Sequence, residues 1–437
     1  MAARRKLTLT TEILIAMIAG AVLGLILNLT AADSAFVRDV FTAGIFSVIG
    51  SIFVAALKML VVPLVFVSLI CGVTALGDIA QLGRIGLKAL VFYLFTTAVA
   101  ITIALTLAGI IDPGKGFVIG DGSATFTGKQ APPISKVLTD LVPANPVAAM
   151  ADGNMLQIIV FAILLGIAMT LAGERGKHVL NLFTDLNAVM MKMVGIVMRI
   201  APIGVFCLIA KTFATQGVDV ILPLAGYFVT VVLALLIHAL GVFSILIRLV
   251  GGLDPIMFFR KMRAAMVFAF STASSNATIP VTLDTVENRL GVKNSVASFT
   301  VPLGATINMD GTAIMQGVAT VFIANVYAVD LGVPEYLMVI LTATLASIGT
   351  AGVPGVGLIM LSMVLVQVGL PVEGIALIIG VDRLLDMMRT AVNITGDSVA
   401  TCLIAKSEKA FDMDRFKDPT AGAIEGDVPA ASTARAE

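Results

Sequence analysis

The hydrophobic positions of the chain form long blocks that are separated by polar connections. A helix needs about 20 consecutive apolar residues to cross a lipid bilayer, and blocks of that length recur throughout the first 250 residues. They lie near residues 11–29, 43–75, 88–111, 147–172, 181–212 and 221–249. This pattern predicts six transmembrane helices in the first part of the chain.

Basic residues mark alternate connections as cytoplasmic, because cytoplasmic loops are enriched in Lys and Arg. The polar stretch 112–146 is expected outside, since long loops follow this rule weakly. The basic start and the first apolar run resemble a signal peptide, but that run is long for one and further spans follow at once, so a retained helix is expected. The basic clusters are Arg4–Lys6, Arg84–Lys88, Arg175–Lys177 and Arg260–Arg263.

The second half begins with a segment whose two ends are both basic, at Arg260–Arg263 and Arg289–Lys293. Both ends are therefore expected in the cytoplasm. Between them, the polar run Phe268–Pro280 contains Ser, Thr, Asn and Pro residues that break a helix. A re-entrant hairpin fits both observations, because bare backbone inside a membrane is tolerated only where protein covers it or a cavity solvates it.

The arrangement then recurs. The span Val296–Val329 is interrupted at Asn308–Thr312, and the stretch Tyr336–Leu370 has a helix-breaking middle at Ser347–Gly357. A last span, Val372–Ala405, returns to the cytoplasm. A hairpin followed by an interrupted span thus occurs twice, from opposite sides, which predicts an inverted repeat with a binding site where the broken helices meet.

Composition agrees with an all-α membrane protein. Hydrophobic residues make up 58% of the 437 residues and charged residues 13%, whereas a soluble domain has about 25% charged residues. Lys+Arg and Asp+Glu are balanced at 28 each, so nothing indicates nucleic acid as a partner. Cys71, Cys207 and Cys402 stand singly in apolar stretches. They are expected to be packing residues, because metal and disulfide roles need clusters or pairs.

The last span carries the candidate chemistry. Its polar side chains fall within an arc of roughly 120° on a helix, and each buried charge costs about 2.5–3.5 kcal/mol. A salt-bridge stripe that joins helices is one interpretation; a polar cavity lined by this face is the one we favour. The residues are Asp382, Arg383, Asp386, Arg389, Thr390, Asn393 and Asp397.

Negative charge exceeds positive charge on this face once Asp310 of the preceding span is added. Bound cations would balance it. Asn308, Asp310, Asn393 and Asp397 offer hard oxygen ligands, and unwound carbonyls at Gly304–Met309 could complete a cage. Sodium fits better than a transition metal, because neither motif contains Cys or His. His178 and His238 are interpreted as structural residues, His238 as lying alone in an apolar helix.

Arg389 indicates an acidic substrate. A guanidinium binds a carboxylate through two parallel hydrogen bonds, and Asp386, one turn earlier, could accept an ammonium group. This pair suits a dicarboxylic amino acid. The second carboxylate could bind Asn393, Thr390 and backbone N–H groups at the two hairpin tips, because half-helix dipoles favour anions.

Three motifs closely resemble the dicarboxylate/amino acid:cation symporters, the family of archaeal aspartate and animal excitatory amino acid transporters. They are Asn308–Thr312, Ser347–Gly355 and Asp386–Asp397, within a resemblance over residues 8–410. Membership implies eight transmembrane helices, two re-entrant hairpins, a homotrimer in the inner membrane with both termini cytoplasmic, and an elevator mechanism. It implies sodium-coupled transport of aspartate or glutamate, with no organic cofactor.

The resemblance also implies roles for single residues. The substrate would contact Ala273, Ser274, Ser275, Thr312, Val353, Gly357, Asp386, Arg389, Thr390 and Asn393. One sodium would use Gly304, Asn308, Asn393 and Asp397, and a second Thr306, Met309, Ser347, Ile348 and Thr350. A third would use Asp310, Asn308, Tyr93, Thr96 and Thr97.

The chain departs from the family pattern at one function. Prokaryotic members have an Arg where this chain has Ala273, and animal members have it where this chain has Met387. Arg383 could replace it by pairing with Asp386; pairing with Asp382 alone is the alternative. Gln316 stands where animal members have a proton-carrying Glu, so proton transport through that position is not expected.

The resemblance implies domain boundaries and leaves alternative functions. C4-dicarboxylate carriers resemble the chain less at Asp386. The alternatives are proton coupling, a C4-dicarboxylate or cystine carrier, an intramembrane aspartyl enzyme, and a channel. The implied parts are scaffold helices in 1–85, a transport helix in 86–112, scaffold and transport helices in 113–250, the transport core in 251–410, and a disordered cytoplasmic tail in 411–437.

Overall fold

The computed structural model describes residues 9–31, 34–74, 83–117, 142–348, 350 and 352–421. These residues fold almost entirely into helices, and among them the β-structure is limited to one isolated bridge between Val292 and Phe411. The predicted all-α membrane class is therefore confirmed at this level. Six stretches in the described residues are long and apolar enough to cross a membrane: Thr11–Ala31, Val37–Ala56, Arg84–Ile111, Glu174–Val197, Arg199–Asp219 and Ile221–Val250.

The helices of the first half follow the predicted blocks. They are α1 (Leu9–Ala31), η1 (Val37–Phe46), α2 (Ser47–Thr74), α3 (Gly83–Ile111), α5 (Pro146–Asp152), α6 (Met155–Leu171), α7 (Glu174–Gln216), η2 (Gly217–Val220) and α8 (Ile221–Leu236). The short elements η3 (Ile237–Val242), α9 (Phe243–Ile245) and η4 (Leu246–Val250) continue from α8. At 1.5 Å per residue, the 43 residues of α7 extend about 65 Å, which exceeds one membrane thickness.

The single helix expected at 147–172 is wrong in detail, because two helices occupy this range. The Asn145 side chain accepts hydrogen bonds from the backbone N–H groups of Val147 and Ala148, at 3.0 and 3.2 Å, and caps α5. Gly153 then ends α5 with a left-handed conformation at φ 68°, a conformation that favours glycine. The apolar α6 begins only at Met155.

The second half breaks its helices at the polar segments. Its elements are α10 (Pro255–Thr272), α11 (Ser275–Asp284), η5 (Thr285–Arg289), α12 (Asn294–Ile307), α13 (Asp310–Val326), α14 (Val333–Ser347), α15 (Val356–Gln367), η6 (Val372–Gly374), α16 (Ile375–Ser407) and α17 (Met413–Lys417). The breaks fall within the three predicted segments. However, α16 is one uninterrupted helix, so the expected second interrupted span is wrong.

The break between α10 and α11 has a local cause. Ala273 adopts a left-handed conformation at φ 50°, which ends α10, and the Ser274 side chain accepts a hydrogen bond from Ala277 N at 3.2 Å, which caps α11. Pro280 lies inside α11 rather than at the break. The polar tip is therefore formed by a helix stop followed directly by a helix start.

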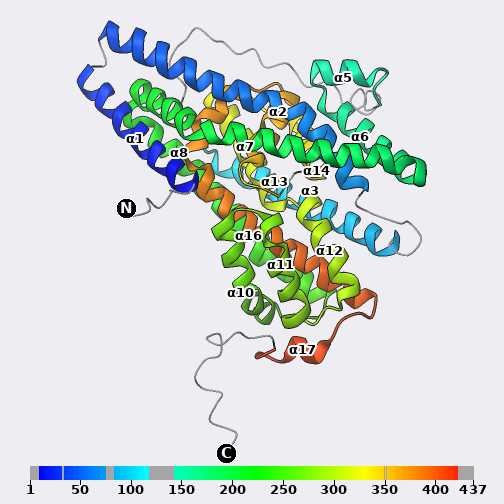
Figure 1. Ribbon diagram of the computed structural model, residues 1–437. Helices are drawn as coiled ribbons and strands as arrows, with labels where there is room; N and C mark the ends of the chain where they lie inside the picture. The colour runs from blue at the N-terminus through cyan, green and yellow to red at the C-terminus, as the bar shows by residue number, and fades with distance from the viewer. Residues whose placement is uncertain are drawn as a thin grey trace, which may run out of the picture.

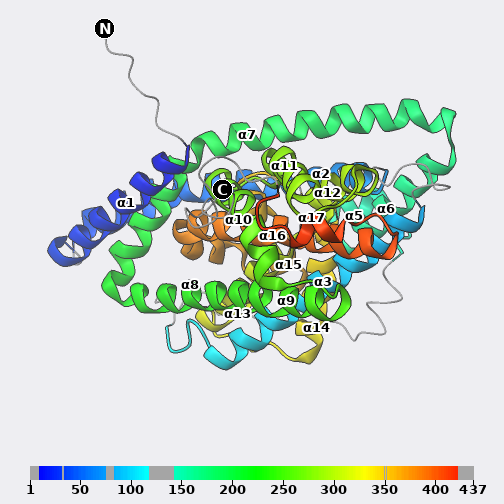
Figure 2. The same ribbon diagram turned by 90° about the horizontal axis from the view of Figure 1, so that it is seen from below.

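Two groups of helices pack separately around α16. In one group α1 and α2 pack on α7, and α6 packs on α2; in the other α13 packs on α3 and α8, while α10, α12 and α13 pack on α16. In Figure 1, α10, α11, α12 and the lower end of α16 form a lobe that projects from the layer of α1, α2 and α7. Seen from below, α7 and α8 run along opposite edges with α16 between them (Figure 2).

The tail does not begin at residue 411, which corrects the expected boundary of disorder. Residues 411–421 contain α17, whose Phe416 is buried, and Asp412 N donates to Gly291 O at 2.7 Å. The polar composition of the whole tail concealed two aromatic residues, Phe411 and Phe416, whose rings pack on each other. Residues 422–437 lie outside the described part of the chain.

Candidate substrate and cation site

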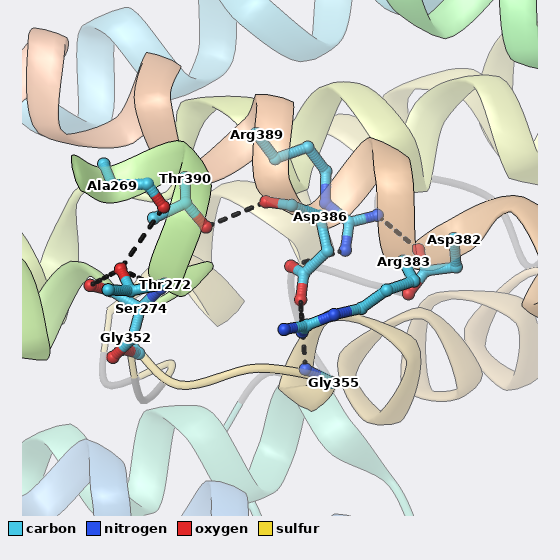
Figure 3. A network of polar contacts seen from close by, with 10 residues as sticks. All are labelled: Ala269, Thr272, Ser274, Gly352, Gly355, Asp382, Arg383, Asp386, Arg389 and Thr390. Atoms are coloured by element: carbon cyan, nitrogen blue, oxygen red, sulfur yellow. Dashed lines mark hydrogen bonds and ion pairs between the residues drawn. The ribbon is translucent and has the colours of Figure 1, made fainter. Parts of the chain in front are cut away.

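Four charged side chains of α16 pair with one another (Figure 3). The Arg389 guanidinium donates through Nη1 to Asp382 Oδ1 at 2.5 Å and through Nη2 to Asp386 Oδ1 at 2.8 Å. Arg383 Nη1 lies 3.5 Å from Asp386 Oδ2. Asp382 was not among the predicted substrate residues, although its position two helical turns before Arg389 on the same face was the signal that could have identified it.

Arg389 is the most enclosed charge of this network. Its side chain is 0% exposed, and its Nε atom has no hydrogen-bond acceptor among the described residues. Burying an ion is costly unless it is paired and hydrogen-bonded. The two aspartates supply the pairing, while the remaining donor leaves capacity for a further oxygen ligand.

Two glycines bring neighbouring helices against Arg389. A Cβ atom on Gly357 of α15 would lie 3.2 Å from Arg389 Nη2 and 3.4 Å from Thr312 Cγ2. A Cβ atom on Gly311 of α13 would lie 2.6 Å from the Arg389 carbonyl oxygen. Helices α13, α15 and α16 therefore converge on this guanidinium, and the structure brings together the predicted residues Thr312, Gly357, Asp386 and Arg389.

The tips of the two helix pairs contact each other beside Asp386. Ser274 Oγ donates to Gly352 O at 2.7 Å, and Asn276 N donates to the same oxygen at 3.1 Å. Gly355 N donates to Asp386 Oδ2 at 3.3 Å. A Cβ atom on Gly352 would lie 2.9 Å from Ser275 Cβ. Ala273 is the left-handed residue of the first tip, and the half-buried Val353 follows Gly352 in the second.

Two predicted substrate residues have side chains that bond within the protein. Thr390 Oγ1 donates to Asp386 O at 2.8 Å within α16. Asn393 Oδ1 accepts from Gly311 N at 2.7 Å, and Asn393 Nδ2 lies 3.4 Å from Met309 Sδ. Asn393 thus joins α16 to the break between α12 and α13.

An oxygen-rich group lies deeper along α16. Asn308 Nδ2 donates to Asp397 Oδ1 at 2.9 Å and to Asn393 O at 3.1 Å, while the buried Asn308 Oδ1 has no hydrogen-bond donor among the described residues. A Cβ atom on Gly304 would lie 2.5 Å from Asp397 Oδ1. This donor set, with one unpartnered oxygen and a buried carboxylate, fits a hard cation such as sodium, and it is the predicted first set.

Asp310 lies next to this group and is fully buried. Its Oδ1 accepts from Thr97 Oγ1 at 2.7 Å and from Thr96 Oγ1 at 3.3 Å, and its Oδ2 lies 3.0 Å from His238 Nε2. The Tyr93 hydroxyl donates instead to Thr300 O at 2.9 Å. The structure therefore brings Thr96 and Thr97 to Asp310 and directs Tyr93 elsewhere.

His238 is not isolated in an apolar helix, which corrects its interpretation. Its ring contacts Asp310, 72 residues away, and packs at 4.6 Å against the ring of Phe243. No local motif connects these two residues. Only the packing of α8 and η3 against α13 and α16 places the ring there, so residue patterns along the chain could not identify it.

The second predicted cation group is only partly assembled by contacts. Gly352 lies against Ala305 O, which brings the second tip close to the end of α12 near Thr306 and Met309. Ser347 Oγ donates to Thr344 O and Thr350 Oγ1 to Ala346 O, so both hydroxyls bond within their own turn. Ile348 caps α14. This group stays a prediction.

Comparison with known proteins gives one consistent result. The chain is 38% identical over 421 residues to the proton/glutamate-aspartate symporter of Escherichia coli, covering 94% of this chain and 95% of that protein. It is 33% identical to the proton/sodium-glutamate symport protein of Bacillus caldotenax, at 94% and 97% coverage. It is 36% identical to the C4-dicarboxylate transport protein of Bacillus subtilis, at 83% and 88% coverage. Residues 9–407 match the sodium:dicarboxylate symporter family, and the chain belongs to this family of membrane transporters.

Proposed function

We propose that this protein is a sodium-coupled symporter for acidic amino acids, L-aspartate or L-glutamate. The observation that carries the proposal is the fully buried Arg389 guanidinium, which faces Asp386 where three helices and both tips converge. A buried guanidinium binds a carboxylate with two donors, and a neighbouring aspartate binds an ammonium group. The relatives from Escherichia coli and Bacillus caldotenax carry names of glutamate symporters, which supports the same substrate class.

In the proposed complex, Arg389 binds the side-chain carboxylate and Asp386 the amine. Thr312, Thr390, Asn393 and the first tip, Ala273 to Ser275, hold the other carboxylate. Val353 and Gly357 act as the gate over the substrate. The contact between Ser274 and Gly352 supports a tip that covers this site.

Sodium ions are proposed as co-transported substrates at two to three sites. The first site, Gly304, Asn308, Asn393 and Asp397, is supported by the unpartnered Asn308 Oδ1 and the buried Asp397 carboxylate. The third, around Asp310, Asn308, Thr96, Thr97 and Tyr93, is supported by the two threonine contacts. The second, Thr306, Met309, Ser347, Ile348 and Thr350, rests on the resemblance alone.

The transport cycle is proposed to be an elevator movement in a homotrimer embedded in the lipid of the inner membrane, with both termini cytoplasmic. The separate packing of α1, α2, α6 and α7 supports a scaffold, and that of α3, α8 and α10–α16 supports a transport domain. Apolar side chains that face outward on α1 and α7, such as Ile18, Leu29 and Ile196, suit lipid or a neighbouring subunit.

A C4-dicarboxylate carrier is the second candidate, because Arg383 pairs with the carboxylate that would otherwise await an amine. Proton coupling and cystine remain the other substrates to compare. Purified protein in proteoliposomes should take up radiolabelled aspartate when a sodium gradient points inward, and unlabelled aspartate, glutamate, succinate and cystine should compete in that order of class. An inward proton gradient without sodium is the matched condition. Absence of aspartate and glutamate uptake under both gradients would overturn the proposal.

A further inference from the structure

Both oxygens of the Asp386 carboxylate are engaged within the protein. Oδ1 accepts from Arg389 Nη2 at 2.8 Å, while Oδ2 lies 3.3 Å from Gly355 N and 3.5 Å from Arg383 Nη1. In Figure 3 the Arg383 guanidinium lies across the free end of this carboxylate, next to the second tip. The position beside Oδ2 is also the one that a substrate ammonium would need.

The two arginine contacts differ in strength. The Arg389 contact has the length of a charge-assisted hydrogen bond, and its side chain is 0% exposed. The Arg383 contact is longer than the usual hydrogen-bond range of about 2.7–3.2 Å, and its side chain is 14% exposed. A ligand that competes for Asp386 therefore displaces Arg383 first.

Arg383 also has space to withdraw. It lines a cavity of about 30 Å³ together with Asp386 on one side and Phe53, Ala201 and Val205 of α2 and α7 on the other. Long arginine side chains change rotamer at low cost. The guanidinium can thus move toward this cavity when an ammonium group approaches Asp386.

The charges of this region sum to zero, since Asp382 and Asp386 balance Arg383 and Arg389. We propose that Arg383 is a tethered cation that occupies the ammonium position at Asp386 and sets the substrate specificity of the site. An amino acid displaces it, whereas a dicarboxylate without an amino group binds while Arg383 stays and neutralises Asp386. This inference rests on the proposed function and extends it to succinate-like substrates.

The mechanism gives opposite signs for two ligands. Removing the Arg383 charge frees Asp386 for an ammonium group, so aspartate gains affinity. The same change leaves Asp386 as an uncompensated carboxylate beside a bound dicarboxylate, so succinate loses affinity, because like charges in a poorly solvated site repel. A residue with a purely structural role would weaken both ligands together.

The test measures dissociation constants of aspartate and succinate by isothermal titration with the purified full-length protein at saturating sodium. Arg383→Met keeps the length of the side chain without its charge, and Arg383→Lys restores the charge. Leu384→Ala, at a half-exposed neighbour on the same helix, is the matched control. We expect Arg383→Met to shift the succinate-to-aspartate ratio of dissociation constants by at least tenfold, and the Lys variant to return it toward the wild-type value.

The outcomes separate this inference from the proposed function. Wild-type protein that binds aspartate but not succinate, or an Arg383→Met variant that changes both constants by the same factor, overturns the role of Arg383. Wild-type protein that binds neither ligand overturns the proposed function itself. Should Arg383→Met fail to fold, an unchanged ratio in Arg383→Lys and Arg383→Gln would count against the inference equally.

Discussion

Replacement of Lys261 by Met tests how the end of the chain holds the α10–α11 pair. Lys261 is 4% exposed; its Nζ donates to Arg289 O at 2.7 Å and to Arg415 O at 2.8 Å, and lies 5.7 Å from the centre of the Phe416 ring. It thus joins the helix that precedes the first tip to the residues that follow the second helix of the pair and to α17.

The magnitude follows from these contacts. Two hydrogen bonds from a charged donor contribute about 1.5–3 kcal/mol each, and the cation–π contact about 0.5–2 kcal/mol. Burial of the ammonium costs several kcal/mol, which Met does not incur. The net loss should be about 2–3 kcal/mol, which corresponds to roughly 30- to 150-fold faster exchange of the amides that depend on the contact.

Hydrogen exchange with mass spectrometry measures this directly. The amides of Asp412 and Lys293, which bond to Gly291 O and Ala410 O, should exchange faster in Lys261→Met, while amides of α13 should not change. Arg260→Met, at the exposed neighbouring position on α10, is the control and should leave both sets unchanged. Unchanged exchange at Asp412 in Lys261→Met, or equal acceleration along the whole chain, would refute a local clasp.

Three further substitutions probe the site. Arg389→Lys keeps the charge but loses the two-pronged donor, so aspartate affinity should fall by about 100-fold in titration calorimetry; a change below threefold would contradict its assigned contact. Gly311→Ala places a Cβ atom 2.6 Å from Arg389 O and should abolish uptake, whereas Gly195→Ala, which meets nothing within 4 Å, should not. Asp397→Asn should raise the sodium concentration for half-maximal aspartate binding by at least tenfold, and an unchanged sodium dependence would remove Asp397 from the cation site.

Local residue chemistry explains why the helix breaks were predictable. Small and polar side chains at Ala273–Ser274 and Asn308–Met309 stop one helix and cap the next, and these effects act within a few residues. Buried charges on one helical face are equally visible in a sequence, since the 3.6-residue period places them together. These two signals were sufficient for the breaks and for most of the residues around Arg389.

Contacts between distant elements were not predictable in the same way. The His238–Asp310 pair depends on how α8 and η3 lie against α13, and neither residue has a neighbour in sequence that signals the other. The ordered segment after residue 410 depends on Lys261 and Gly291, more than 100 residues earlier. Composition averages over such a segment, so two aromatic anchors in a polar tail do not register.

The two charge groups on α16 differ in a way that connects cation and substrate. The outer group around Arg389 and Asp386 is internally neutral, whereas the inner group of Asp397 and Asp310 is negative and attracts cations. Asn393 lies between them, and its Oδ1 holds Gly311 N at 2.7 Å. A cation that orders Asn308 and Asn393 would therefore fix the start of α13, which carries Thr312 against the substrate position. Cation binding would then raise substrate affinity through this one helix start, and substrate binding would raise cation affinity by the same factor.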